Sequence, residues 1–150
     1  SITVNDPNLN GRTLEIRDGI NTTVIFEFDD HGVWTSGRTP IDISAAPTAN
    51  DVAVVTASVI NGVGAALEIT ATSAGNVVTL THDRPGTFGN QSLATSTNRL
   101  TLSNMSGGAG YDCAEGVACT QDADCSYTLG LVCVIANGQA VGTCQVPPVP

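Results

Sequence analysis

The chain has 150 residues, of which 41% are hydrophobic and only 13% are charged, so a folded core is expected rather than disorder. The formal net charge is −9, there is no lysine, and the five arginines are scattered. This composition excludes the clustered basic side chains that nucleic-acid binding needs, and an acidic surface would be repelled by anionic lipid. No stretch reaches 18 consecutive apolar residues, so we expect no membrane insertion.

The N-terminal region predicts a short strand followed by a β-hairpin. Residues 2–4 alternate apolar and polar side chains, as a half-buried strand does. Residues 13–17 and 22–28 also alternate, and Asp18-Gly19 between them is a hairpin turn signal. Residues 33–34 and 41–43 are shorter strand candidates.

Residues 48–62 are the segment that we expect to be helical. Thr48 can serve as the N-cap, with Asp51 in a capping-box position, and Asn61-Gly62 provides the C-terminal stop. One apolar face is formed by Val52, Val55, Val59 and Ile60. Valine is a poor helix former, so tertiary packing must hold this helix in place.

The second half of the module predicts another hairpin, from residues 67–72 and 77–82, and a last strand at residues 100–102. The predicted fold class is therefore α+β: mostly antiparallel sheet and hairpins with one packed helix, plus a small disulfide-rich C-terminal appendage. The expected buried residues are Val24, Phe26, Phe28, Val52, Val55, Val59, Leu67, Ile69, Val78 and Leu80.

The glycine-rich segment 106–110 predicts a boundary between two parts. Residues 1–108 form the β-rich module with one helix. Residues 109–150 form a cysteine-rich appendage, which ends in a proline-rich tail, residues 146–150, that can be neither helix nor central strand.

Five cysteines crowd into the last third of the chain, a density that suits an oxidising compartment outside the cytoplasm. Because the chain starts at Ser1 without methionine, we expect a signal or upstream region to be missing. Zinc is the less frequent explanation, since the cysteines form no C-x-x-C pair and have no nearby histidine.

Two stretches resemble known families. Residues 1–110, with ITVNDPNLNGRTLEIRDGINTTVIFEFDD, NVVTLT, PGTFGN and a closing GG, resemble a module repeated in large bacterial surface proteins and in phage virion and tail proteins. Residues 119–144, with CTQDADCSYTLGLVCVIANGQAVGTC, resemble a Dickkopf-like motif of secreted proteins. The first resemblance implies a scaffold without catalytic residues. The second favours the disulfides Cys119–Cys133 and Cys125–Cys144 among the three possible pairings.

Few residues suggest chemistry. His31 lies in a polar turn and His82 at a strand end, and surface positions are the more frequent explanation for both. Asp29 and Asp30 with His31 could contact a cation, but a solvated turn is more common without EF-hand spacing. Asp122 and Asp124 could bind calcium weakly, although turn capping is more common. We therefore expect no enzyme activity and no cofactor.

These observations favour a secreted or cell-surface structural protein that assembles with copies of itself into a filament, a surface appendage or a virion-like fibre. The expected subunit contacts are Ile2, Val4, Val146 and Val149, where the two chain ends could add to a neighbour. Cys113 lies outside the Dickkopf-like motif and is the candidate for an intermolecular or unpaired thiol. The alternative is an adhesion module that binds carbohydrate or a protein, although few aromatic side chains are available for it.

Overall fold

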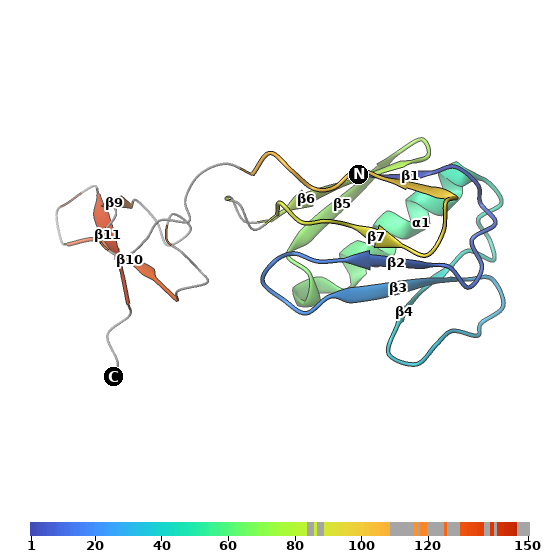
Figure 1. Ribbon diagram of the computed structural model, residues 1–150, viewed down its shortest axis with the longest axis horizontal. Helices are drawn as coiled ribbons and strands as arrows, with labels where there is room; N and C mark the ends of the chain where they lie inside the picture. The colour runs from blue at the N-terminus through green and yellow to red at the C-terminus, as the bar shows by residue number, and fades with distance from the viewer. Residues whose placement is uncertain are drawn as a thin grey trace. The chain divides into compact units, whose positions relative to one another are not determined.

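The computed structural model describes residues 1–83, 86, 89–108, 116, 118–119, 125, 130–136, 139 and 141–146, without the side chains of residues 118–119. The chain divides into two compact units (Figure 1). Unit 1 consists of Ser1–Asp83 and Asn90–Ser106, and unit 2 consists of Arg84–Gly89 and Gly107–Pro150. The predicted parts, residues 1–108 and 109–150, differ from this division in the placement of Arg84–Gly89, and the predicted boundary stays a prediction.

The first sheet of unit 1 is antiparallel and has the strand order β5-β6-β1-β8. Its hairpin and its last strand are the ones that the sequence predicts, within two residues at each end. The strands are β1 (Ile2–Val4), β5 (Ile69–Ala74), β6 (Val77–His82) and β8 (Leu100–Leu102).

The N-terminal strand lies in the interior of this sheet. Ile2 pairs with Val78 of β6 on one side and with Leu102 of β8 on the other, and both Ile2 and Val4 are fully buried. The prediction that Ile2 and Val4 are subunit contacts is therefore wrong. A strand of three residues is too short to anchor itself alone, but hydrogen bonds to two neighbouring strands hold it within its own unit.

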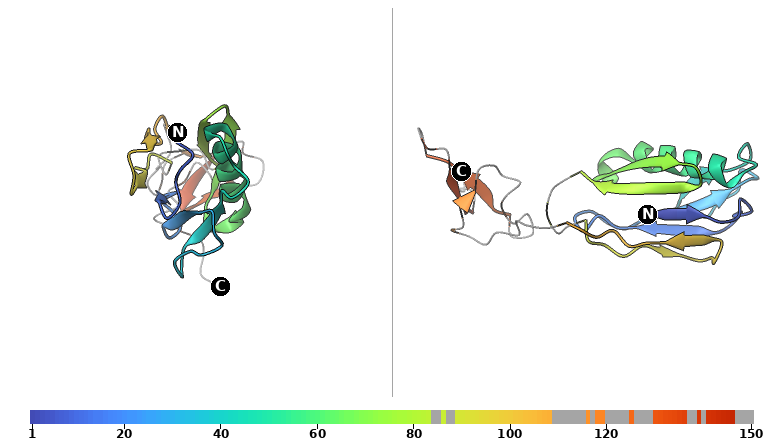
Figure 2. Two further views of the ribbon diagram at one scale, coloured as in Figure 1. Left: turned by 90° about the vertical axis from the view of Figure 1, so that its right-hand side faces the viewer. Right: turned by 90° about the horizontal axis from the view of Figure 1, so that it is seen from above.

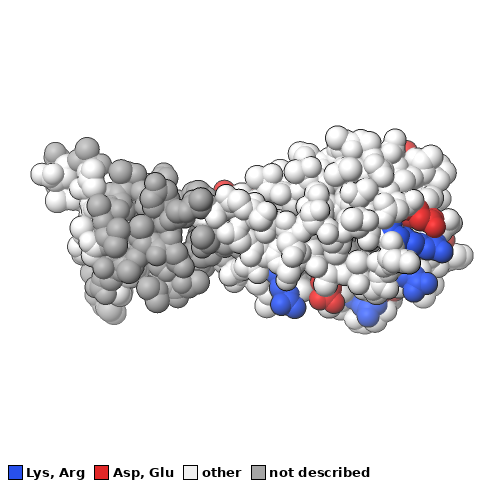
Figure 3. Space-filling view, turned by 45° about the horizontal axis from the view of Figure 1, so that its top comes forward, with Lys and Arg blue, Asp and Glu red and all other residues white. Residues whose placement is uncertain are grey.

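The outer face of the first sheet is lined with threonine. Because the apolar side chains of these strands turn inward, the alternate residues face outward. Figure 3 shows a broad uncharged area on unit 1 beside a side where charged residues gather. The outward pairs are Thr70 with Thr81, Thr72 with Thr79, and Thr3 with Thr101.

The second sheet of unit 1 has the strand order β4-β3-β2-β7. The predicted hairpin of β2 and β3 is confirmed, with Leu14 opposite Phe26. β4 runs parallel to β3. The alternation of apolar and polar residues could not indicate this, because alternation shows to which face each side chain points and not how two strands are oriented relative to each other. The strands are β2 (Thr13–Ile16), β3 (Val24–Asp29), β4 (Thr39–Asp42) and β7 (Ala94–Thr95).

The predicted helix is confirmed as α1 (Ala49–Gly62), and a short 3-10 turn, η1 (Gly64–Ala66), follows it. Thr48 is the N-cap and forms a capping box with Asp51. Figure 2 shows α1 along one side of the strands, with β7 and β8 on the other side. The helix packs against β5, β6 and β1 and also touches β4, so it connects the two sheets.

One hydrophobic core joins the two sheets and the helix. Every residue predicted to be buried belongs to it: Phe26, Phe28, Val52, Leu67, Ile69 and Val78 are buried, and Val24, Val55, Val59 and Leu80 are partly buried against it. The helix face is rotated from the predicted one, because Ala53 and Ala57 are buried in place of the two bulkier valines. Small side chains allow the helix to approach the strands closely.

One edge of each sheet, β5 in the first and β4 in the second, is blunted. The Asn61 side chain donates from Nδ2 to the Ala71 carbonyl oxygen at 2.9 Å and accepts from the Ala71 amide at 2.8 Å. These are the two bonds that an added strand would make at Ala71 of β5. On β4, the Ile43 amide donates to Asp29, so Pro40 lies with its nitrogen turned outward and offers no N–H. Neither edge is an open template for a neighbouring strand.

Unit 2 contains a three-stranded antiparallel sheet with the order β10-β11-β9. Its strands are β9 (Ala118–Cys119), β10 (Val132–Val134) and β11 (Gly142–Gln145). A disulfide joins Cys125 to Cys144, with the two Cα atoms 5.3 Å apart. The predicted fold class, α+β with a disulfide-containing C-terminal part, is confirmed. No helix within the described ranges has both the length and the apolar character that a membrane span needs.

Candidate functional site

The loop of residues 30–38, which joins β3 to β4, covers the outer face of the second sheet. Because Phe26 and Phe28 face the core, Glu27 and Asp29 turn outward, yet both are buried, with 7% and 3% of their surface exposed. The parallel pairing of β3 and β4 requires the chain to cross back, and the loop does so over these two acids. The two carboxylates therefore lie between the sheet and the loop, where they can accept hydrogen bonds from the loop.

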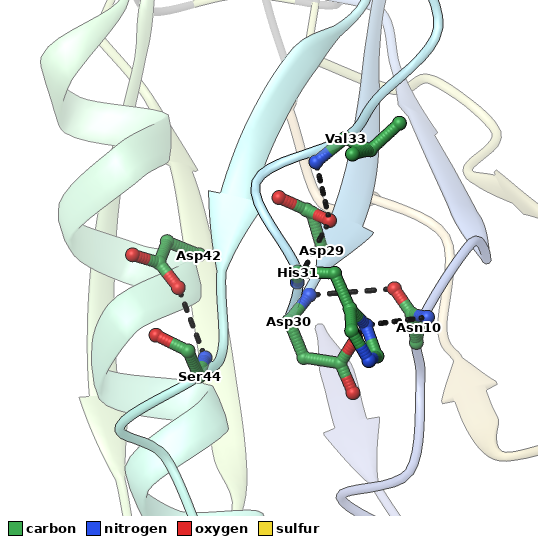
Figure 4. A network of polar contacts seen from close by, with 7 residues as sticks. All are labelled: Asn10, Asp29, Asp30, His31, Val33, Asp42 and Ser44. Atoms are coloured by element: carbon green, nitrogen blue, oxygen red, sulfur yellow. Dashed lines mark hydrogen bonds and ion pairs between the residues drawn. The ribbon is translucent and has the colours of Figure 1, made fainter.

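The first carboxylate, Asp29, holds the beginning of the loop (Figure 4). Its Oδ1 accepts hydrogen bonds from the amides of His31 and Val33, each at 3.1 Å. Asn10, from the segment before β2, accepts from the Asp30 amide at 3.3 Å, and its Nδ2 lies 3.3 Å from Nδ1 of His31. His31 also contacts the Asp30 carboxylate. This end of the loop is fixed by side chains from two parts of the chain.

The second carboxylate, Glu27, holds the end of the loop. Its Oε2 accepts from the Thr35 amide at 3.1 Å and from Nη1 of Arg38 at 2.9 Å. The Thr35 amide is the main cause that lowers the pKa of Glu27; burial opposes it, and the Arg38 guanidinium adds to the lowering. The carboxylate therefore stays ionised to a lower pH than an ordinary glutamate does.

Between these two attachments the loop exposes its apolar residues. Val33 is 78% exposed and Trp34, the only tryptophan of the chain, is 47% exposed. The prediction of a strand at residues 33–34 is wrong, because the loop amides bind carboxylates rather than a neighbouring strand. The sequence signal that could have revealed an exposed site is a tryptophan between the turn residues His31-Gly32 and Gly37.

The acidic turn does not form a metal site in the described part of the chain. There, no three His, Cys, Asp or Glu side chains come together in a way that could hold a metal ion. Asp29 uses its carboxylate for backbone amides, and His31, with 72% of its side chain exposed, is a surface residue. His82 places Nε2 at 2.9 Å from the carbonyl oxygen of Asp18. Asp122 and Asp124 lie outside the described residues.

Asp18 is a structural carboxylate that the sequence marks only as a turn residue. It is fully buried and accepts hydrogen bonds from the amides of Ile20, Asn21 and Glu68 and from the Asn21 side chain. Burial raises its pKa, but the hydrogen bonds, led by the Glu68 amide, outweigh burial and lower the pKa to about 2. Asp18 thus ties the β2–β3 turn to the start of the β5–β6 hairpin.

The cysteines of unit 2 are oxidised where the structure describes them. The Cys125–Cys144 bond is one of the two that the Dickkopf-like resemblance favours, and Cys133 is disulfide-bonded as well. Cys113 and the side chain of Cys119 lie outside the described residues, so the partner of Cys133 and the unpaired-thiol prediction for Cys113 stay open.

The β10–β11 hairpin of unit 2 exposes several large apolar side chains. Val134 ends β10, and Val141 directly precedes Gly142, the first residue of β11. A Cβ atom added at Gly142 would lie 2.3 Å from the Val134 oxygen and 2.8 Å from Cγ1 of Ile135, so Ile135 lies against this glycine. The exposed fractions are 40% for Val134, 41% for Ile135, 51% for Val141 and 58% for Val146. Val149 lies outside the described residues.

Comparisons with protein-family models, with curated proteins and with solved structures find no match to this chain. The family resemblances proposed from the sequence motifs therefore stay predictions. Two features of the molecule are candidates for function, the attached loop of unit 1 and the apolar hairpin of unit 2.

Proposed function

We propose that the protein is a secreted structural protein that assembles with copies of itself outside the cell. The observation that carries this proposal is the exposure of four large apolar side chains on the β10–β11 hairpin: Val134, Ile135 and Val141 near the connection of the two strands, and Val146 at the other end. The described part of unit 2 buries only Cys125, Leu131 and Cys144, so among the described residues of this unit more large apolar side chains are exposed than buried. We take these exposed side chains as the association site.

The distribution of apolar side chains in unit 1 supports the same assignment. Its described residues form a large core and expose only Val33, Trp34 and Val54 among the large hydrophobic side chains. One edge of each of its sheets is blunted, by Asn61 at β5 and by Pro40 at β4, and its N-terminal strand is internal. Assembly through the N-terminal strand, which the sequence suggested, is therefore disfavoured, and we assign the contact to the hairpin of unit 2.

The chemistry of the described side chains supports a structural role over a catalytic one. The acids of unit 1 accept backbone amides: Asp18, Glu27, Asp29 and Asp42 each bind at least one. The hydroxyl and amide of Ser44 lower the pKa of Asp42. The disulfide of unit 2 fits an oxidising compartment. These groups order turns and loops.

The test is the oligomeric state of the full chain, measured by sedimentation velocity over a range of protein concentrations. We expect concentration-dependent association that strengthens with added salt, because salt screens the repulsion between subunits of net charge −9. The variant Val134→Thr/Ile135→Thr/Val141→Thr should weaken association at least about tenfold, since each buried valine or isoleucine contributes roughly 1.5–3 kcal/mol.

The control is Val54→Thr, which changes a valine on α1 of unit 1 that is also exposed, at 56%. It should associate like the parent protein. A parent chain that remains monomeric at high concentration would overturn the structural-assembly proposal. Equal weakening by Val54→Thr would move the contact away from the hairpin.

A further inference from the structure

We propose that the loop of residues 30–38 is a binding site for a neutral carbohydrate, with the Trp34 ring as the platform for a sugar. This site lies in unit 1 and is independent of the assembly surface proposed for unit 2. The loop is held firmly and yet exposes apolar side chains. Two buried carboxylates hold the loop at both ends, yet the loop presents Val33 and Trp34 to water.

The exposure of these two side chains is not needed to hold the loop. The loop is attached through the amides of His31, Val33 and Thr35 and through the Arg38 guanidinium, so in three of these four contacts the loop itself contributes only a backbone amide. A polar residue at position 33 or 34 would keep the same contacts and would expose less apolar surface to water. A rigid loop also loses little conformational entropy when a ligand binds, which is the advantage of a preorganised site.

The size of the apolar tip favours a sugar over a protein partner. A stable protein interface covers about 800 Å² on each partner and involves roughly 20–30 residues. Here two apolar side chains stand alone among polar neighbours. The C–H groups on one side of a pyranose ring can pack on an indole ring, which offers a large rigid apolar surface with few torsions to fix.

The polar side chains of the same loop can serve the hydroxyl groups of the sugar. The Asp30 carboxylate is 37% exposed and the His31 imidazole is 72% exposed, and Asn10 holds both of these residues in position. Together they provide hydrogen-bond acceptors and a donor on the same loop as Trp34. Apolar stacking with a few placed polar groups is the usual composition of a small-molecule site.

The charge around the loop selects a neutral ligand. Asp29, Asp30 and Asp42 lie at this end of the second sheet, with Asp42 directly opposite Asp29 in the β3–β4 pairing. The Arg38 guanidinium is bound to Glu27 and so is already neutralised. An anionic sugar would meet these carboxylates and be repelled.

The experiment uses the full chain and begins with an array of neutral and acidic oligosaccharides. Because Trp34 is the only tryptophan, titration of a bound sugar with detection of tryptophan emission reports on this loop alone. The soluble probes are cellotetraose and chitotetraose, with tetragalacturonate as the acidic comparison. We expect binding of at least one neutral oligosaccharide, with a saturable change in emission and no response to tetragalacturonate.

The variants separate the loop from the rest of the protein. Trp34→Ala should weaken binding at least about tenfold in calorimetry, and Asp30→Asn, which keeps the shape of the side chain, should weaken it less. Val54→Ala is the control for loss of an exposed apolar side chain and should bind normally. Thermal unfolding checks that each variant is folded. The proposal is overturned if no neutral oligosaccharide on the array binds, if binding leaves the Trp34 emission unchanged, or if Trp34→Ala binds like the parent.

Discussion

Units 1 and 2 keep their loops in place by different means. In unit 1 an extensive apolar core spans two sheets and a helix, and buried carboxylates attach the turns to it. In the described part of unit 2 the core consists of Leu131 with Cys125 and Cys144, and these two cysteines are joined by a disulfide. Hydrogen-bonded acids are enough to order loops where a buried core supplies the stability, whereas a part of the chain with little core depends on a covalent cross-link.

The largest expected effect comes from the core of unit 1. Phe26 is fully buried opposite Leu14, so Phe26→Ala should lower the free energy of unfolding of unit 1 by roughly 3–5 kcal/mol. Denaturant unfolding monitored by Trp34 emission measures this loss, because Trp34 belongs to unit 1. A loss below about 1 kcal/mol would contradict the placement of Phe26 at the centre of the core.

The disulfide of unit 2 should have the next largest effect. The two cysteines are 19 residues apart in the sequence, and for such a loop the chain-entropy model gives a stabilisation of the folded state of roughly 3 kcal/mol. In Cys125→Ala/Cys144→Ala we expect the amides of β10 and β11 to lose hydrogen-exchange protection while those of β2 and β3 keep it. Reductant added to the parent protein should reproduce this pattern. Loss of protection in both units would show that unit 1 depends on the disulfide too.

The buried carboxylate of unit 1 gives a smaller, pH-dependent effect. Because the fold lowers the pKa of Asp18 from 3.8 to about 2, the ionised form stabilises the folded state. The contribution, about 2 kcal/mol, is complete above the ordinary pKa and is lost as the pH falls from about 4 through 2. Asp18→Asn should remove most of this contribution at neutral pH. Between pH 4 and 2 the free energy of unfolding of unit 1 should then change less in the variant than in the parent.

The matched control for Asp18 is Asp51→Asn, at an exposed capping position. Denaturant unfolding at several pH values measures both variants. If Asp18→Asn is as stable as the parent at neutral pH, the amides of Ile20, Asn21 and Glu68 do not depend on the charge of this carboxylate.

Periodic patterns in the sequence predict most of the secondary structure of unit 1. The alternation of Leu14 and Ile16, and of Phe26 and Phe28, gives the first hairpin, and Thr48 with Asp51 gives the beginning of α1. These signals are local, because they depend on residues two to four positions apart. Pairing between distant segments has no such signal, so the parallel β3–β4 contact and the interior position of β1 could not be predicted.

The candidate site was missed for a related reason. Glu27 and Asp29 alternate with phenylalanine, which predicts exposed side chains on the outer face of the sheet. They are buried because the loop of residues 30–38 crosses over them, and this crossing follows from the parallel pairing. Once β4 is placed beside β3, the two acids and the exposed Trp34 belong to one structure, whereas in the sequence Val33-Trp34 resembles a short strand.

The smallest expected effect concerns a polar group in the core of unit 1 that, unlike the buried acids, has no hydrogen-bond partner. Thr56 is fully buried on α1, and its Oγ1 is the buried side-chain oxygen or nitrogen without a hydrogen-bond partner among the described residues. An unsatisfied buried hydroxyl costs about 1–3 kcal/mol of desolvation. Thr56→Val keeps the branched shape and replaces that hydroxyl by a methyl group, so helix propensity changes little.

We therefore expect Thr56→Val to stabilise unit 1 by about 1 kcal/mol, which corresponds to a rise in Tm of roughly 4–8 °C for a unit of this size. Thr56→Ser is the opposite control, because it keeps the hydroxyl and deletes the methyl group, and it should lower the Tm. Thermal unfolding monitored by Trp34 emission measures both. If Thr56→Val lowers the Tm instead, the hydroxyl has a partner in solution, and the buried polar groups of unit 1 are then all satisfied, as its carboxylates are.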